Sequence, residues 1–369
     1  MPTAPRRKTP KTAGADVEAQ LLAIERGEGD GNIELDNGKL HVSSLGKTYF
    51  AKSGTTKGAL MRYYARIWPV LHAHVEDRPL VLKRFPDGVG GQMFFQQNAG
   101  PRVPEGVRVK TFDTKDEGPK PRIIGGDLLT MLYTVQLGAI EVHPWLSRTR
   151  DIDAADRCLI DLDPGDDVPF SHVVDLARDV LKIAKQCELP IAVKTSGSSG
   201  MHLVIPLPPR TSYDTSAQLA LLVARAVVAH RPERATVQRS IRARPKGTIY
   251  VDALQNARGK SMACAYSVRA REDGTVSAPL RERELTSRLR TSAFTIRTVP
   301  ARVAKVGDVF GEALANRPTA RTIKDAMRAL EQVLEERPAA AEPQRKVKRS
   351  RAGGEGARTA GGRSRIPRA

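Results

Sequence analysis

The sequence contains few residues that could cross-link or staple a small domain. Only three of its 369 residues are cysteines (Cys158, Cys187 and Cys264), and none of them belongs to a C-x-x-C pair. Their wide spacing excludes a zinc ribbon and a disulfide framework. We therefore interpret them as buried thiols of a protein that works in a reducing compartment.

Hydrophobic runs long enough to cross a membrane are also lacking. The most apolar segment, 217–229, is interrupted by Arg225 and falls short of the ~20 residues that a spanning helix needs. The N-terminus is polar and rich in proline and lysine, unlike a secretory signal. These features predict a cytoplasmic protein with no membrane partner.

Acidic residues are scarce at both ends of the chain. Residues 1–14 carry four bases and no acid, and residues 337–369 carry ten bases and two acids. The net charge is +19, of which these segments supply +4 and +8, leaving +7 for residues 15–336. Basic arms of this kind are typical of proteins that bind nucleic acid. A solubility tail would show the same charge.

The segment between the arms predicts a mixture of helices and strands, with no internal repeat. Its length and the 40% apolar content of the chain suffice for one large domain or two lobes. Hydrophobic periodicity predicts helices at 57–75, 127–140, 171–187, 215–230 (with Asp214 as N-cap) and 320–336. Strands are predicted at 79–85, 91–96, 157–162, 190–195, 202–206, 248–252 and 262–268. This order indicates an α+β chain with several hairpins rather than a βαβ alternation.

The most informative motif is Asp161-Leu162-Asp163-Pro164, which ends an apolar strand. Alternate residues of a strand point to one side, so both carboxylates share a face. Two adjacent anions repel each other, and a hard divalent cation would offset that repulsion. An ordinary strand-to-turn exit would also use Asp and Pro.

Two further segments indicate a phosphate site when they are considered together with this pair. The loop 195–202, Thr-Ser-Gly-Ser-Ser-Gly-Met-His, lies between two apolar strands and has the small residues that form an anion nest, although a plain hairpin loop would look similar. Asp252 ends the apolar strand 248–252, where a lone carboxylate is more often a cap. Three strand-end carboxylates and an anion loop together are what a two-metal phosphoryl-transfer site requires.

Aromatic and basic side chains upstream suggest contacts with nucleic acid. Phe94 and Phe95 are adjacent on a predicted strand, so one ring is expected to enter the core while the other stacks on a base. The alternative is that both rings lie in the core. The bases Lys47, Lys57, Lys83 and Arg84 accompany them.

In this order and spacing, the three motifs resemble those of the archaeo-eukaryotic primase superfamily. They are most similar to the polymerase domain of bacterial DNA ligase D, which works in non-homologous end joining. The resemblance runs from about residue 40 to about residue 310. Further matching segments are Gly54–Gly58, Arg78-Pro79, Lys83–Gly88, Phe94-Phe95, Glu141–Trp145 and Gln255–Lys260.

The resemblance implies a fold and a domain plan. We expect a primase-like catalytic core of mixed and antiparallel sheets flanked by helices, with a smaller N-terminal α/β extension. The plan is a basic, disordered arm over 1–30, a primase-polymerase domain over 31–318, a C-terminal helix over 319–336 and a basic, disordered tail over 337–369. No Lys-x-Asp-Gly adenylation motif is present, so we expect a stand-alone polymerase module or a piece of a larger protein.

The resemblance also implies roles for individual residues. Two Mn²⁺ or Mg²⁺ ions would be held by Asp161, Asp163 and Asp252. The incoming NTP or dNTP would contact Lys83, His143, Ser196, Gly197, Ser199, Gly200, His202, Gln255 and Arg269. A DNA 5′-phosphate would be gripped by Ser44, Lys47 and Lys57, and the template would stack on Phe94 or Phe95.

Two departures from the family pattern bear on binding. Ser44 stands where the phosphate pocket often has Asn, which predicts weaker recognition there. Ser199 stands where some members have a Lys directed at the triphosphate, so that loop lacks one charge. Neither change touches the carboxylates.

The implied function is template-directed nucleotidyl transfer at DNA ends and gaps, with Ku and a separate ligase as further partners and the nucleoid as location. A primase fold kept only as a non-catalytic clamp on DNA ends is the main alternative, although a clamp gains nothing from crowded anions near DNA. A metal-dependent glycosyltransferase would also use an Asp-x-Asp motif, but the aromatic pair and the basic arms fit it poorly.

Overall fold

The computed structural model describes residues 13–114 and 118–336, and the outer parts of both predicted arms, 1–12 and 337–369, lie outside this range. The α-helices are α1 (Ala13–Arg26), α2 (Lys57–Val75), α3 (Leu128–Gln136), α4 (Phe170–Gln186), α5 (Tyr213–His230), α6 (Val299–Val306), α7 (Val309–Ala315) and α8 (Ala320–Glu336). Among the described residues, no helix has the length and apolar character to cross a membrane.

The strands fall into sheets of two, three and six. Two-stranded sheets are formed by β1 (Gly31–Leu35) with β2 (Gly38–Val42), β3 (Thr48–Phe50) with β4 (Thr55–Thr56), and β7 (Val109–Thr114) with β8 (Gly118–Ile123). A three-stranded sheet has the order β6 (Phe94–Gln96), β5 (Leu80–Arg84), β9 (Ala139–Pro144). The largest sheet has the order β13 (Ala235–Thr236), β14 (Ile249–Asp252), β10 (Arg157–Pro164), β12 (Met201–Pro206), β11 (Ala192–Thr195), β15 (Pro279–Leu280).

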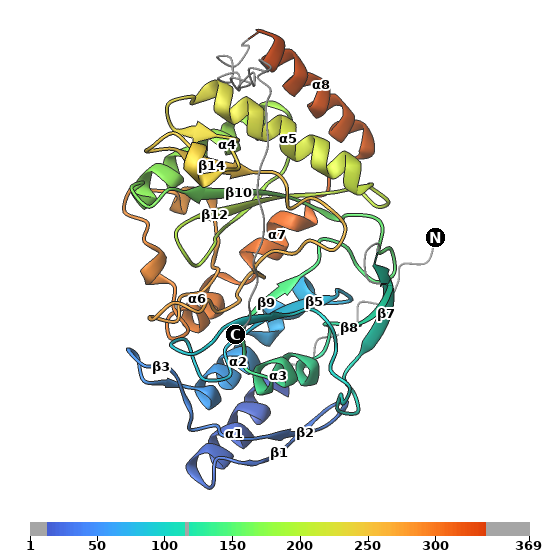
Figure 1. Cartoon of the computed structure of the whole chain (residues 1–369), viewed down its shortest axis with the longest axis vertical. Helices are drawn as coiled ribbons and strands as arrows, with labels where there is room; N and C mark the ends of the chain where they lie inside the picture. The colour runs from blue at the N-terminus through green and yellow to red at the C-terminus, as the bar shows by residue number, and fades with distance from the viewer. Residues whose placement is uncertain (1–12, 115–117, 337–369) are drawn as a thin grey trace, which may run out of the picture.

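Figure 1 shows how these sheets divide the molecule. The six-stranded sheet lies in one half with α4, α5 and α8, whereas α1, α2 and α3 lie in the other half, next to the three-stranded sheet. The strand pairs are antiparallel apart from the parallel pair β13–β14. The predicted α+β class with mixed and antiparallel sheets is therefore what the chain adopts.

Local sequence explains why the main helices form where they do. In α4, Val173, Leu176, Val180 and Ala184 recur at helical spacing and are all buried, as predicted. The predicted helix at 57–75 coincides with α2, and Thr56 caps it by accepting a hydrogen bond from the Ala59 N–H at 3.0 Å.

The predicted disorder of residues 1–30 is wrong for the described part of that segment. Residues 13–26 form α1, and its Val17 and Leu21, four residues apart, are buried. The helix packs against α2, where Glu18 pairs with Arg66 and Glu25 pairs with Arg62. In the sequence, the charges of α1 outweigh its short apolar stripe. That stripe is nevertheless sufficient to order the helix, because α2 covers it.

Three local predictions also need correction. The helix predicted over 127–140 ends at Gln136, because Gly138 turns the chain with a φ of +87° and β9 begins at Ala139. The N-cap of α5 is Ser212 rather than Asp214, and its hydroxyl accepts from the Thr215 N–H at 3.1 Å.

The strand predicted at 262–268 does not form. This segment makes a single isolated bridge, Val268 to Val276, and Tyr266 has a φ of +68°, which no extended strand accommodates. The Tyr266 hydroxyl donates instead to Asp308, at the N-terminus of α7, over 2.8 Å.

Candidate active site

Four side chains form a row across the six-stranded sheet. Asp161 on β10 lies directly opposite Asp252 on β14 and His202 on β12, and His202 lies opposite Lys194 on β11. Residues directly opposite each other point to the same face of a sheet. The strand registers thus gather side chains that are up to 91 positions apart in the sequence (161 to 252). We call these four residues the cross-strand row.

The row faces away from the helix layer of its sheet. Cys158 points to the other face of β10, since it is an odd number of residues from Asp161, and its thiol donates to the Ser216 carbonyl of α5 at 3.4 Å. Both α4 and α5 pack against β10. The carboxylates therefore lie on the face of β10 opposite Cys158 and its contact with α5.

Asp161 occupies an electrostatically unfavourable position. Burial raises its pKa to about 7, and the carboxylates of Asp163 and Asp252 act in the same direction. Asp252 is held in place, because its oxygens accept from the Leu254 N–H at 2.7 Å and from the Gln255 amide at 3.2 Å. A bound cation would relieve the repulsion between these carboxylates.

Asp163 shares the face of Asp161 but is engaged by a base. Its carboxylate lies 3.2 Å from Arg244 Nη1, and the Arg244 guanidinium lies 4.2 Å from the ring centroid of Tyr250. Across 13–114 and 118–336, no group of three or more His, Cys, Asp or Glu is arranged to hold a metal ion. Asp161 and Asp252 offer the hard oxygen donors that suit Mg²⁺ or Mn²⁺, and the role of all three acids as ligands stays a prediction.

The small-residue loop lies at the end of the row. Ser196 Oγ accepts from the backbone N–H groups of Ser198 and Gly200, each at 3.1 Å. The backbone N–H groups of the loop therefore converge, as an anion nest requires, but they converge on the Ser196 hydroxyl. Because Ser196 Oγ acts as acceptor in both bonds, its hydrogen remains for an outside acceptor. Ser199 is exposed at the tip of the loop.

Two glycines of this loop are required by close packing. A Cβ on Gly197, which has a φ of +74°, would lie 2.6 Å from Arg269 Cγ and 2.8 Å from the Ser277 nitrogen. A Cβ on Gly200 would lie 2.2 Å from the Leu162 carbonyl oxygen. These contacts hold the loop against the strand that carries the acids.

A second cluster faces the loop from the three-stranded sheet. Glu141 on β9 is 2% exposed and binds Lys83 Nζ at 3.2 Å, His143 Nε2 at 3.0 Å and Arg269 Nε at 2.9 Å. These three bases together with the Ala270 N–H (3.1 Å) hold the pKa of Glu141 far below its usual range despite burial. Arg269 also donates to the Ser196 carbonyl and so joins the two sheets.

Glu141 therefore brings several of the predicted nucleotide-binding residues together, although the sequence analysis assigned it no role. Lys83, His143 and Arg269 meet on Glu141, and Arg269 connects them to the Ser196 loop. The available signal was the Glu-x-His pattern at 141–143, which puts both side chains on one face of a strand. The sequence analysis included Glu141 in the matching segment Glu141–Trp145 but assigned a role only to His143.

A pocket of about 540 Å³ opens beside the three-stranded sheet. Phe95, Gln97 and Trp145 line it from one side, and the segment from Gln255 to Ser261, which follows β14, lines it from the other. Gln255 connects it to the acids, through its bond to Asp252. The pocket is thus lined by the exposed ring of Phe95 and by a residue that contacts one of the acids.

The prediction that one ring of the Phe94-Phe95 pair enters the core is wrong, as is the alternative that both do. Phe94 is 41% exposed and Phe95 is 56% exposed, and β6, which carries them, is an edge strand of its sheet. Arg84 lies 4.8 Å from the Phe94 ring centroid, and Phe95 meets His143 edge-on at 6.5 Å. Both rings remain open to a ligand.

The predicted 5′-phosphate residues lie together at the start of α2. Lys57 is buried and donates to the Ser43 carbonyl at 2.9 Å, and its backbone N–H donates to the Lys47 carbonyl at 2.8 Å. Burial, and secondarily the charge of Lys47, lowers the pKa of Lys57 to about 8. Ser44 adjoins them with a φ of +55°, and its N–H donates to Asp30 at 2.5 Å.

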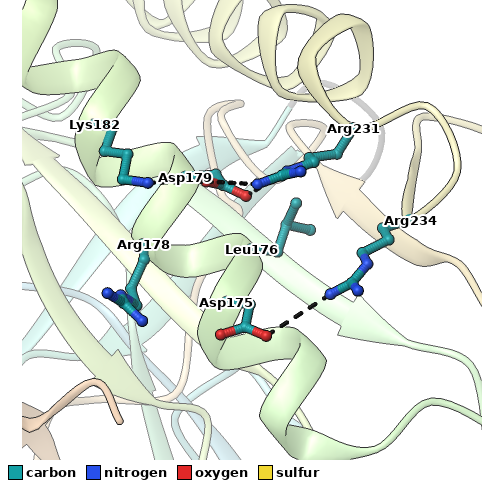
Figure 2. A pocket seen from close by; sticks show the side chains of 7 residues that line it. All are labelled: Asp175, Leu176, Arg178, Asp179, Lys182, Arg231 and Arg234. Carbon is teal, nitrogen blue, oxygen red and sulfur yellow. Dashed lines mark hydrogen bonds and ion pairs between the residues drawn. The ribbon is translucent and has the colours of Figure 1, made fainter. Parts of the chain in front are cut away.

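A different charged hollow, of about 280 Å³, lies on the outer side of α4 (Figure 2). Its bases face its own acids: Arg231 binds Asp179 at 2.8 Å, and Arg234 lies 3.7 Å from Asp175. The four bases of the hollow outnumber its two acids, and both acids are paired with arginines, so the hollow offers no free pair of carboxylates for a metal ion. We therefore assign the chemistry to the cross-strand row rather than to this hollow.

Acidic side chains on two neighbouring strands, beside an anion loop and a cluster of bases, form the kind of arrangement that phosphoryl transfer uses. Residues 56–310 match the family model described as the LigD primase-polymerase domain. The chain belongs to this family.

Relatives and a solved structure agree with this assignment. The chain is 34% identical over 248 residues, 67% of its length, to the multifunctional non-homologous end joining protein LigD of Pseudomonas aeruginosa. It is 32% identical over 273 residues, 74% of its length, to the bifunctional non-homologous end joining protein LigD of Bacillus subtilis. The chain spans only 29% and 44% of the lengths of these relatives.

Among solved structures, the chain resembles the polymerase domain of Mycobacterium tuberculosis ligase D in complex with DNA. The TM-score is 0.70 at 28% sequence identity, over 76% of this chain and 99% of that domain. This likeness confirms the predicted fold class.

Proposed function

We propose that this protein is a template-directed nucleotidyltransferase that fills gaps and extends DNA ends during double-strand break repair by non-homologous end joining. The observation that carries the proposal is the cross-strand row, in which two carboxylates lie opposite each other beside His202 and the Ser196 loop. Membership of the primase-polymerase family and the DNA-bound polymerase domain among its structural neighbours support it.

The acids provide the metal end of the proposed reaction. Asp161, Asp163 and Asp252 would hold two Mn²⁺ or Mg²⁺ ions, which supply charge neutralisation and activate the primer 3′-hydroxyl for attack on the α-phosphate. Arg244 lies 3.2 Å from Oδ2 of Asp163, which leaves the other carboxylate oxygen for a metal ion. The crowding at Asp161 explains why the chain alone holds these groups at a cost.

The loop and the Glu141 cluster provide the triphosphate end. Ser196 has a hydroxyl hydrogen to donate, and the adjoining His202, Lys83, His143 and Arg269 add N–H donors and positive charge. These groups bind the NTP or dNTP, hold its α-phosphate beside the acids and stabilise the pyrophosphate that departs. Gln255, which bonds to Asp252 and lines the adjacent pocket, would contact the nucleotide next to the metal ions.

The N-terminal half provides the contacts with DNA. Lys47 and Lys57, with Ser44 beside them, bind the 5′-phosphate at a gap, and the exposed rings of Phe94 and Phe95 stack against the template. Ku and a separate ligase are the partners expected for such a step, which takes place on the nucleoid in the cytoplasm.

Extension of a gapped duplex that carries a 5′-phosphate tests the proposal. We expect the wild-type protein to add nucleotides with Mn²⁺ or Mg²⁺, and NTPs and dNTPs should be compared separately. The variant Asp161→Ala/Asp163→Ala should bind the same duplex but add nothing. If the double variant extends the primer normally, the assignment is wrong. If the wild type binds DNA ends without extending them under any of these conditions, the protein is an end-binding clamp.

A further inference from the structure

Lys194 is a buried base that the proposed reaction does not use directly. It is fully buried on β11, and its Nζ lies 2.5 Å from His202 Nδ1 and 2.7 Å from Ser277 Oγ. His202 is the only member of the cross-strand row that Lys194 contacts in these bonds. A lysine in this position is far too enclosed to bind DNA or nucleotide itself.

The directions of these hydrogen bonds follow from what each group can do. The Ser277 hydroxyl donates its single hydrogen to the Thr195 carbonyl at 2.8 Å, so it accepts from Lys194. An ammonium group has donors and no acceptor, which means that Lys194 also donates to His202 Nδ1. His202 Nδ1 must then carry no hydrogen in the neutral ring.

The other ring nitrogen faces the acids. His202 Nε2 lies 3.5 Å from Asp161 Oδ1, on the side where the triphosphate would lie. Because Lys194 donates to Nδ1, that nitrogen carries no hydrogen, and the ring is therefore neutral. A neutral ring that accepts at Nδ1 carries its one hydrogen at Nε2.

We propose that Lys194 is a positioning residue that fixes His202 as the Nε2–H tautomer, so that His202 presents a hydrogen-bond donor to an anionic phosphate oxygen. With the opposite tautomer, a nitrogen lone pair would face the phosphate and repel it. The choice of triphosphate as the ligand rests on the proposed function, whereas the tautomer depends only on the groups around the ring.

The tautomer can be read directly from ¹⁵N–¹H NMR spectra of protein labelled in its seven histidines, with His202→Gln identifying the His202 signals. At pH 6, where Lys194 with its pKa lowered to about 7 is still charged, the wild type should show a single Nε2–H form. In Lys194→Met this pure signature should be lost, giving a mixture of tautomers or a protonated ring. The control Arg157→Met removes another buried base from the same sheet face and should leave the His202 signals unchanged.

Gap filling supplies the second measurement. The KM for NTP should rise roughly tenfold in Lys194→Met with little change in the affinity for gapped DNA, because a donor to the triphosphate is lost. Should Lys194→Met fail to fold, Ser277→Ala, which removes the other partner of Lys194, should give an intermediate change in both readouts. A wild-type ring with its hydrogen on Nδ1, or a pure Nε2–H form in Lys194→Met, would overturn the inference.

These results separate the inference from the proposed function. The tautomer is measured without nucleotide or DNA, so it stands or falls independently of polymerase activity. A wild type that adds no nucleotide would remove the proposed function and leave the NMR result intact.

Discussion

Two charged regions of this protein surround their acidic side chains with opposite charges. In the hollow outside α4, Asp179 is surrounded by bases, with Arg231 at 2.8 Å and Lys182 at 3.7 Å (Figure 2). In the cross-strand row, Asp161 is half-buried beside two other carboxylates, which raise its pKa further. The first arrangement stabilises the fold, whereas the second costs stability and has no structural benefit. Like charges that a fold holds together are therefore the better mark of function.

The largest expected effect comes from removing an acid of the row. Asp161→Asn and Asp252→Asn should each lower the rate of gap filling by about 10²–10³-fold or more, because a charge that holds the reacting groups is lost. Asp179→Asn should leave the rate unchanged. The measurement is primer extension at saturating nucleotide, with DNA binding checked by fluorescence anisotropy. Equal losses in all three variants would mean that the two regions do not differ as described.

A smaller loss is expected at the cluster that organises the nucleotide contacts. Glu141→Gln keeps the shape of the side chain but removes the charge that binds Lys83, His143 and Arg269. These groups should shift, and the KM for NTP should rise by roughly tenfold. The matched control is Glu284→Gln, which breaks a partly buried ion pair with Arg302 away from the site. An unchanged KM in Glu141→Gln would show that the cluster is only structural.

The same comparison predicts that Asp161→Asn and Asp179→Asn change the free energy of unfolding in opposite directions. A carboxyl whose folded-state pKa is raised is destabilising once the pH exceeds its unfolded pKa, so Asp161 opposes folding at pH 7. Asp161→Asn should raise the free energy of unfolding of the metal-free protein by roughly 1–4 kcal/mol. Asp179→Asn should lower it by about 1–3 kcal/mol, because a buried acceptor is lost from its bases. Urea unfolding at pH 7 measures both, and a destabilised Asp161→Asn protein would contradict the argument.

The smallest effect concerns the start of α2. The pKa of Lys57 is lowered to about 8, so in the free protein the charge that attracts phosphate is present below that pH and disappears above it. The preference for 5′-phosphorylated over 5′-hydroxyl gaps should therefore fall by a few-fold between pH 7 and pH 9. Competition binding measures this ratio. In Lys57→Met the ratio should be smaller and independent of pH, and a wild-type ratio that stays constant would exclude Lys57 from phosphate binding.

The sequence predicted most of the core of the fold and the meeting of Asp161 with Asp252. Apolar periodicity placed α2 and α4 almost to the residue, and the strand-end positions of Asp161 and Asp252 anticipated their meeting on one sheet. The register could not be predicted, because it depends on long-range pairing. Only the register shows that Asp161, His202 and Lys194 lie in one line.

Other features could not be predicted from the sequence, for physical reasons. The stripe that orders α1 is too short to be recognised without α2 as its cover. Phe94 and Phe95 are both exposed on an edge strand, which adjacent-residue alternation does not reveal. The pairing of Asp163 with Arg244 joins residues 81 positions apart and leaves no local signal.

The most direct test is a crystal structure of the protein with Mn²⁺, gapped DNA and a non-hydrolysable NTP. The account predicts an anomalous peak in contact with both Asp161 and Asp252, with the triphosphate reaching Ser196 and His202. A bound triphosphate with no manganese between those two carboxylates would contradict it.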